Sequence, residues 1–428
     1  MTTKRRDFIK MSSLAIAGSA LPAGMLIPGT AFGKAKPKKL KIGLIGCGGR
    51  GTGAASQALK ADSDVVLHAM GDVFEDKLQT SLTNLSKIHG EKVKVKEKRR
   101  FLGFDAYQKV LDSGVDVVIL ATPPGFRPEH LTAAVDAGKH IFCEKPVAVD
   151  APGIRKVLEA AKKAADKNLS LVSGFCWRYH TPKRAIFGKI LDGAVGEVST
   201  VYNTYNTSAI WSHPRQPGWT DMEYQMRNWP YYAWLSGDHI VEQACHSIDM
   251  MSWAMGGKLP VNVMGTGGRQ VRTDELFGHI YDHFAITYEY ENGAKGFHFS
   301  RQQQNCQNSY AVEVFGDKGR AVIDCSRNIH EIQGSNGWKF SGEPNDMYQT
   351  EHDELFASIR NEKPINDGEF MAHSSLIAIM GRMAAYTGKR ITWEEALNSS
   401  ETLGIEVTGW KQQPPAVAVA MPGITEFV

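Results

Sequence analysis

Apolar runs alternate with amphipathic segments along the first 175 residues of this 428-residue chain. The apolar runs are short and rich in Val, Ile and Leu, as buried parallel strands are. They occupy residues 41–46, 64–72, 115–124, 140–143 and 169–175. The segments between them have helical spacing, most clearly after Asp150 and Pro152, which are typical helix-start residues. The alternation predicts a doubly wound, Rossmann-type α/β domain over residues 41–176, with its ligand cleft at the carboxyl ends of the strands.

The hydrophobic period changes to two after about residue 180, where β-branched and aromatic residues alternate with polar ones. Strands are predicted at residues 198–206, 261–267, 284–290, 295–302, 311–316 and 320–324. Asn292-Gly293 and Asp317-Lys318-Gly319 are hairpin turns between successive strands. We therefore expect residues 177–428 to form an α+β domain with a large, mostly antiparallel sheet. Helical patterns at residues 351–360 and 372–386 follow it, and we expect these C-terminal helices to pack back on the first domain.

A glycine-rich turn follows the first strand directly, with the sequence Gly46-Cys47-Gly48-Gly49-Arg50-Gly51. In a G-x-G-x-x-G turn the glycines allow a tight bend, close approach of a pyrophosphate and close packing of strand and helix. The second strand ends in Asp72, about 20 residues on, where an acid accepts hydrogen bonds from the adenosine ribose. An acid there favours NAD over NADP, because a 2′-phosphate would meet a negative charge.

The later strand ends of this domain complete the predicted cofactor site. The strand at residues 115–124 ends in a turn that can lie under the nicotinamide ribose, and the next strand ends in Glu144-Lys145-Pro146. The predicted cofactor-binding residues are Gly46, Gly48, Gly49, Arg50, Gly51, Asp72, Thr122, Pro123, His130, Glu144 and Lys145.

Composition narrows the class of protein. Hydrophobic residues make up 42% and charged residues 22%, which is ordinary for a folded globular protein. The formal charge of +3 leaves no large basic field for nucleic acid. The six cysteines lack C-x-x-C spacing, so neither a zinc site nor a disulfide framework is predicted.

The first 33 residues resemble a targeting segment rather than part of the fold. Paired Arg5 and Arg6 precede a mildly apolar stretch that Ser, Gly and Pro interrupt. This pattern predicts a Tat-type signal at residues 1–33, a basic linker at residues 34–40 and a periplasmic protein delivered by the Tat export machinery. An uncleaved N-terminal membrane anchor is the alternative interpretation of the same segment.

The motifs together resemble the Gfo/Idh/MocA family, which includes glucose–fructose oxidoreductase and inositol dehydrogenases. The resemblance covers nearly the whole chain after the signal, and its motifs occur in the family's order. They are the glycine turn at residues 43–51, Glu144-Lys145-Pro146, and residues 174–180, 234–253 and 386–397. It implies an NAD(P)-dependent oxidoreductase that moves a hydride to or from a hydroxyl carbon of a sugar, glycoside or cyclitol, and a homo-oligomer.

The resemblance also assigns catalytic roles. Lys145 is expected to bond the reacting oxygen or relay its proton, and His246 to act as general base. The segment at residues 239–257 is predicted to be one helix with Glu242, His246 and Asp249 on one face. The family has Asp where this chain has Glu242, which leaves the role of that carboxyl open: it orients the imidazole, binds a substrate hydroxyl or repositions the base.

Substrate contacts are expected beside this helix. The predicted substrate-binding residues are Arg178, Tyr179, Arg227, Trp234 and Asp249, of which Asp249 is more often structural in such a position. No metal is predicted, because Glu242, His246 and Asp249 lack a recognised ligand spacing.

A different class of enzyme begins with the same hydride transfer. Relatives in glycoside hydrolase family 109 use bound NAD for a transient oxidation that permits elimination of the aglycone. Those relatives depart from the Glu-Lys-Pro motif, so its intact form here favours the oxidoreductase.

Overall fold

The computed structural model describes residues 38–415 and 418–428. The Tat-type signal predicted at residues 1–33 lies outside the described residues, as does most of the linker. Residues Lys39–Val428 form one compact unit, which contains both predicted sheets. Across the described ranges, no helix is both long enough and apolar enough to cross a membrane.

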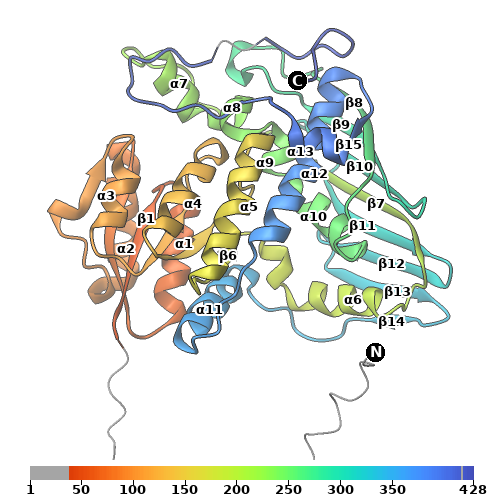
Figure 1. Ribbon diagram of the computed structural model, residues 1–428, viewed down its shortest axis with the longest axis horizontal. Helices are drawn as coiled ribbons and strands as arrows, with labels where there is room; N and C mark the ends of the chain where they lie inside the picture. Colours follow the sequence, from red (N-terminus) through yellow and green to blue (C-terminus); the bar gives the residue numbers. More distant parts are fainter. Residues whose placement is uncertain (1–37, 416–417) are drawn as a thin grey trace, which may run out of the picture. The chain divides into compact units, whose positions relative to one another are not determined.

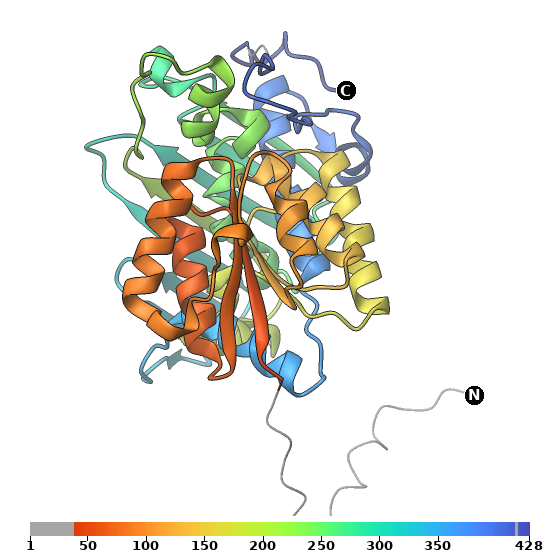
Figure 2. The same ribbon diagram turned by 90° about the vertical axis from the view of Figure 1, so that its left-hand side faces the viewer.

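The first sheet has six parallel strands in the order β3-β2-β1-β4-β5-β6, which confirms the Rossmann prediction. All four residues of β4 are buried, because helices cover both faces. Figure 2 shows α1 and α2 on one face and α3, α4 and α5 on the other. The strands are β1 (Leu40–Ile45), β2 (Val65–Asp72), β3 (Arg100–Leu102), β4 (Val117–Leu120), β5 (His140–Cys143) and β6 (Leu171–Ser173). The helices are α1 (Gly49–Ala61), α2 (Glu75–His89), α3 (Ala106–Asp112), α4 (Arg127–Asp136) and α5 (Ala151–Asp166).

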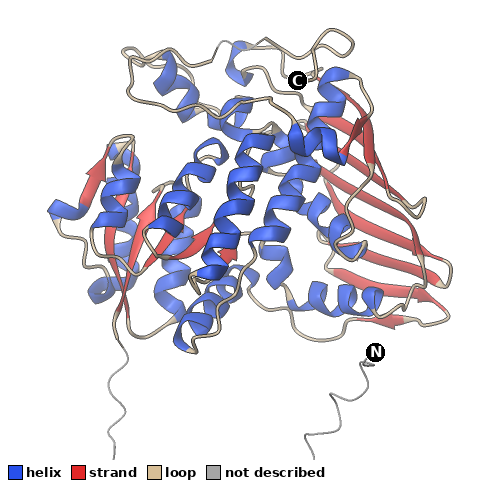
Figure 3. Ribbon diagram, in the orientation of Figure 1, coloured by secondary structure: helices blue, strands red, loops and turns tan. Residues whose placement is uncertain are grey.

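The second sheet has nine strands in the order β14-β13-β12-β11-β7-β10-β9-β8-β15, as Figure 3 shows at the right. Only the β7–β10 pair is parallel, so the prediction of a mostly antiparallel sheet is confirmed. Alternate residues of β9 are buried, because one sheet face carries the core. The strands are β7 (Val198–Thr207), β8 (Asn262–Gly268), β9 (His283–Glu289), β10 (Lys295–Gln302), β11 (Ser309–Gly316), β12 (Gly319–Asp324), β13 (Ile329–Gly334), β14 (Trp338–Lys339) and β15 (Ile391–Thr392).

Two C-terminal helices join the sheets to each other. α12 (Gly368–Thr387) is buried over most of its length between α5 and strands β8 and β9. α11 (Met347–Arg360) packs on α1, so both helices contact helices of the first sheet's layer. The other helices of the second domain are α6 (Thr181–Leu191), α7 (Asp221–Arg227), α8 (Ala233–Ser236), α9 (His239–Glu242), α10 (Cys245–Ala254) and α13 (Trp393–Asn398).

Candidate active site

The glycine turn after β1 is shaped by the absence of side chains. Gly46 has φ +93°, and a Cβ there would lie 2.6 Å from the backbone of Ala121. A Cβ on Gly51 would lie 1.9 Å from the Gly46 carbonyl oxygen, so only glycine lets α1 pack this close to the turn. A Cβ on Gly48 or Gly49 would meet nothing within 4 Å. The first turn of α1 thus opens onto free space, and no side chain caps it, as a pyrophosphate site requires.

Asp72 fastens the end of β2 to this turn. One carboxylate oxygen accepts a hydrogen bond from the Cys47 N–H at 2.6 Å, and the other accepts one from the Phe74 N–H at 2.8 Å. Burial raises the pKa of Asp72, and the two N–H donors oppose that rise. A carboxylate has about four acceptor positions, so capacity remains for ribose hydroxyls. The glycine turn and Asp72 together fit a dinucleotide.

A cavity of about 1830 Å³ lies along the carboxyl edge of the first sheet. One small-molecule ligand typically needs about 300–1,000 Å³, so this cavity has room for a cofactor and a substrate. All eleven predicted cofactor-binding residues line it, and so do Glu242, His246 and Arg227. The structure thus brings the catalytic candidates and the glycine turn into one space.

Lys145 reaches across this cavity from the end of β5. Its ammonium donates a hydrogen bond to the backbone carbonyl oxygen of Glu242 at 2.5 Å. This contact joins the Glu-Lys-Pro motif of the first domain to α9 of the second. Lys145 is therefore held against the helix that carries Glu242, another of the catalytic candidates.

The single helix predicted at residues 239–257 is wrong, because the chain is interrupted between α9 and α10. Gln243 leaves helical geometry with φ −122° and ψ −54°, and its side-chain carbonyl accepts a hydrogen bond from Gln302 of β10. The Ala244 N–H then bonds the carbonyl of His239, five residues back instead of four. Glu242 and His246 therefore lie on different helices rather than one turn apart on the same face, although both line the cavity.

His246 presents a neutral imidazole to the cavity. Its ring is 9% exposed and packs against the rings of Trp177 and Phe175, with centroids at 5.0 and 5.9 Å. Burial lowers the pKa of His246 well below its ordinary value, and the positive charge of Lys145 lowers it further. Within the described structure its Nδ1 has no hydrogen-bond partner. A neutral imidazole is the form that can accept a proton.

Glu242 lines the same space, and the residue is 8% exposed. Burial raises the pKa of Glu242, while the Lys145 ammonium opposes the rise. The amide nitrogen of Gln302 is 3.5 Å from this carboxyl, which is a weak contact. The side chain thus keeps hydrogen-bonding capacity toward the cavity.

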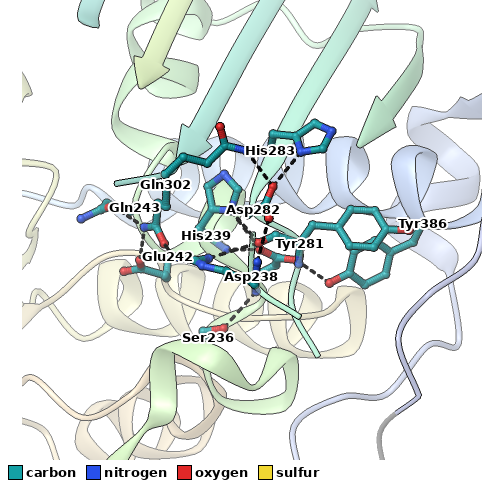
Figure 4. A network of polar contacts seen from close by, with 12 residues as sticks. Ser236, Asp238, His239, Glu242, Gln243, Tyr281, Asp282, His283, Gln302 and Tyr386 are labelled. Atoms are coloured by element: carbon teal, nitrogen blue, oxygen red, sulfur yellow. Dashed lines mark hydrogen bonds and ion pairs between the residues drawn. The ribbon is translucent and has the colours of Figure 1, made fainter. Parts of the chain in front are cut away.

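A buried polar network holds α9 in place, as Figure 4 shows. At its centre Asp238 has φ +74°, an uncommon conformation for a residue other than glycine. Its carboxylate accepts hydrogen bonds from the Tyr281 N–H at 2.8 Å and the Tyr386 hydroxyl at 2.5 Å. It also caps α9 through the His239 N–H. The network therefore fixes the helix that ends in Glu242.

Arg50 ties the glycine turn to two other elements. Its guanidinium donates to Glu144 of the Glu-Lys-Pro motif and, at 2.7 Å, to Glu351 of α11. Burial raises the pKa of Glu351 well above its ordinary value, and Arg50 opposes that rise. The glycine turn, the Glu-Lys-Pro motif and α11 are thus connected through one side chain.

Four of the five predicted substrate residues do not line the cavity. Arg178 and Asp249 form a two-point ion pair at 2.8 Å, and Asp249 also accepts from Ser374 at 2.7 Å. The Tyr179 hydroxyl donates to Asp367. Trp234 is 2% exposed. These contacts give the four side chains structural partners.

Arg227 does line the cavity, but beside the loop after β2. It donates to Asp76 at 3.2 and 3.3 Å, and its guanidinium lies 4.1 Å from the ring centroid of Phe74. Because Phe74 follows Asp72 by two residues, Arg227 is at the ribose end of the predicted cofactor site. These contacts favour a role toward the cofactor.

Several lining residues were not predicted. The polar ones include Tyr205 of β7, Gln243 and Tyr348, and the aromatic ones include Trp211, Trp219, Trp229 and Trp410. For Trp229 the dense aromatics of residues 222–234 were the available signal, but sequence alone does not give the direction of a loop side chain. Among the side chains that the structure describes, no group of three His, Cys, Asp or Glu residues is arranged to hold a metal ion.

Comparison with known proteins agrees with this geometry. Residues 40–171 match the model of an oxidoreductase family with an NAD-binding Rossmann fold, and residues 188–322 match the GFO/IDH/MocA C-terminal domain. A myo-inositol 2-dehydrogenase from Thermotoga maritima is 26% identical over 373 residues, which cover 85% of this chain and 100% of that protein.

Solved structures share the fold. An aldose-aldose oxidoreductase from Caulobacter crescentus, complexed with glycerol, has a TM-score of 0.66 at 22% identity and covers 83% of this chain and 100% of that one. A levoglucosan dehydrogenase in complex with NADH and levoglucosan has a TM-score of 0.65 at 19% identity, with 82% and 99% covered.

Proposed function

We propose that this chain, which belongs to the Gfo/Idh/MocA family of NAD-binding oxidoreductases, transfers a hydride between NAD and a hydroxyl-bearing carbon of a sugar, glycoside or cyclitol. The observation that carries the proposal is the convergence of Lys145, Glu242 and His246 on the cavity that the glycine turn opens into. A dinucleotide site and a proton-accepting site in one space are what carbinol oxidation needs.

The glycine turn would bind the pyrophosphate of the cofactor, and Asp72 would bind its adenosine ribose. A carboxylate with two backbone N–H partners supports the choice of NAD, since it meets ribose hydroxyls better than a phosphate. When bound, the nicotinamide supplies the hydride acceptor or donor.

Side chains of the protein accept the hydroxyl proton and bind the reacting oxygen. The neutral His246 accepts the hydroxyl proton at a ring nitrogen, and burial keeps it unprotonated for that task. The Lys145 ammonium donates a hydrogen bond to the same oxygen and steadies its developing charge. Glu242 is suited to bind a neighbouring substrate hydroxyl, because its carboxyl has few protein partners.

The lining of the cavity supports the proposed substrate class. Trp211 and Trp229 offer flat apolar faces, on which the C–H faces of sugar and cyclitol rings stack. Tyr205 and Gln243 add polar atoms for hydroxyls. The relatives named for myo-inositol, aldoses and levoglucosan support the same class.

Two further parts of the proposal concern export and assembly. The twin arginines Arg5 and Arg6 support export to the periplasm by the Tat route, and replacing both by Lys should leave the protein in the cytoplasmic fraction. A homo-oligomer stays a prediction, supported by the exposed apolar residues Tyr202, Met264 and Phe299 of the second sheet. Sedimentation of the purified protein would test it.

The decisive experiment follows NADH while purified protein is offered a panel of sugars, glycosides and cyclitols, with product analysis. Net NADH formation with an oxidised product is the expected result. Release of an aglycone with no net change in NADH would instead identify the glycoside-cleaving reaction. A wild-type protein that binds neither NADH nor NADPH would overturn the proposal.

A further inference from the structure

A third hydrophobic cluster lies apart from the cores of the two domains. Its members include residues from the loops at the carboxyl edge of the first sheet, from residues 219–235, from residues 277–280 and from a segment near the C-terminus. We define residues 402–410 as the C-terminal strap, of which all but Leu403 line the cavity. Figure 1 shows the dark blue C-terminal chain passing beside α7 and α8. The cluster is thus built around the cavity mouth.

The strap is fastened along the carboxyl edge of the first sheet. The Leu403 and Gly404 N–H groups donate to the Asp150 carboxylate at 2.7 and 2.9 Å, at the start of α5. A Cβ on Gly404 would lie 3.1 Å from the Gly125 carbonyl oxygen, so the strap passes close to the loop after β4. In the first sheet, β4 and β5 lie on one side of β1, and β2 lies on its other side. The strap therefore crosses the switch point of the sheet, between β1 and β4.

Trp410 anchors the far end of the strap. Its ring packs against Phe74 and Phe104, with centroids at 5.2 and 4.9 Å. Phe74 follows Asp72 by two residues, and Phe104 follows β3. Trp410 therefore lies where the adenosine half of a dinucleotide is expected, on the side away from Lys145 in the strand order.

The second domain approaches the same place from the other side. Arg227, at the end of α7, bonds Asp76 and lies over the rings of Phe74 and Trp219, at 4.1 and 5.0 Å from their centroids. It also bonds Glu223 at 2.9 Å, which holds its guanidinium in position. Phe74 is therefore contacted by the strap and by α7 at once.

We propose that the strap and α7 form a clasp over the adenosine half of the bound dinucleotide, which makes release of the cofactor slow. The inference rests on the proposed function, because it requires a dinucleotide in the cavity. For the adenosine to leave, the Trp410–Phe74 packing and the Arg227 contacts must separate. A closed apolar cluster resists that separation, since it exposes aromatic surface to water. The clasp thus acts on cofactor exchange and leaves the chemistry at Lys145 unchanged.

The test measures how fast NADH leaves the full-length protein. Protein loaded with NADH is mixed with a large excess of NAD, and the loss of nicotinamide fluorescence gives the dissociation rate. Trp410→Ala is compared with Trp338→Ala, a matched control in which a tryptophan is removed from β14, outside the cavity. Arg227→Met opens the other side of the clasp and serves if Trp410→Ala does not fold.

We expect Trp410→Ala and Arg227→Met to raise the dissociation rate at least about tenfold, while Trp338→Ala matches the wild type. Equal rates in the clasp variants and the control would overturn the clasp and leave the proposed function standing. Slower release from Trp410→Ala would also overturn it, because Trp410 would then occupy the space that the adenosine needs. Failure of the wild type to bind either NADH or NADPH would overturn the proposed function itself.

Discussion

Two glycines of α1, two residues apart, are predicted to respond to alanine in opposite ways. Gly51 faces the glycine turn, where an added Cβ would lie 1.9 Å from the Gly46 carbonyl oxygen and 3.1 Å from the Ala121 side chain. Gly53 belongs to the same helix, and its added Cβ would meet only the Arg50 guanidinium, at 3.6 Å. The pair separates the effect of helix propensity from the effect of close packing.

The magnitudes follow from these distances. Gly53→Ala makes an ordinary contact and removes a flexible residue from a helix, so it should stabilise the protein by roughly 0.5–1 kcal/mol. In Gly51→Ala, the helix and the turn must move apart by at least 1.1 Å to bring the contact from 1.9 Å to 3.0 Å. Such overpacking typically costs about 1–3 kcal/mol. The two variants should therefore differ by roughly 1.5–4 kcal/mol.

Urea unfolding of both variants and the wild type measures the free energies, and an NADH titration of each measures the dissociation constant. Gly51→Ala should also weaken NADH binding about tenfold or more, which corresponds to about 1.4 kcal/mol, because the turn that faces the pyrophosphate is displaced. Gly53→Ala should bind NADH like the wild type. If Gly51→Ala were as stable as the wild type, or if Gly53→Ala were the weaker variant, our account of the glycine turn would be refuted.

Three other predictions concern the catalytic groups and acid stability. Lys145→Met should abolish turnover and keep NADH affinity in a fluorescence titration; lost affinity would show that Lys145 holds the cofactor instead. His246→Ala should lower kcat by about 10²–10⁴, most strongly at low pH where other bases are scarce, whereas an unchanged pH–rate profile would remove His246 from the base role. Burial lowers the pKa of His298 to about 3, while an unfolded histidine titrates near 6.5, so only the unfolded chain gains this proton as the pH falls below about 6.5. The wild type should therefore lose about 2 kcal/mol more than His298→Gln between pH 7 and pH 5 in denaturant unfolding, and parallel losses would contradict the assignment.

The fold could largely be predicted because its strongest signals are local. The buried strands of the first sheet are continuous apolar runs, and the second sheet shows alternation in strands such as β9. β3 gave no usable pattern, because it has three residues and depends on pairing with β2. A strand whose own residues show a hydrophobic pattern can thus be predicted from sequence. A short strand that forms only by pairing with a neighbouring strand is missed.

The same distinction between local and long-range signals applies to the site residues. The glycine turn, Asp72 and Lys145 follow strand ends, and parallel topology brings such positions to one edge. The break after Glu242 depends instead on the contact of Gln243 with Gln302, which is 59 residues away and has no local signal. The same holds for the Arg178–Asp249 pair, whose two members look like free site residues until α10 places them together.

The contact of α11 with α1 bears on how this protein can be recombined with its relatives. Leu355 and Phe356 of α11 belong to the hydrophobic core of the nucleotide-binding domain, although they follow residue 176 by almost half the chain. Glu351 of the same helix also supplies one of the carboxylates that hold Arg50. A chimera that joins residues 41–176 to a foreign partner would leave this helix behind, expose an apolar groove on α1 and release the arginine. The natural unit of exchange is therefore the first domain together with residues 347–360.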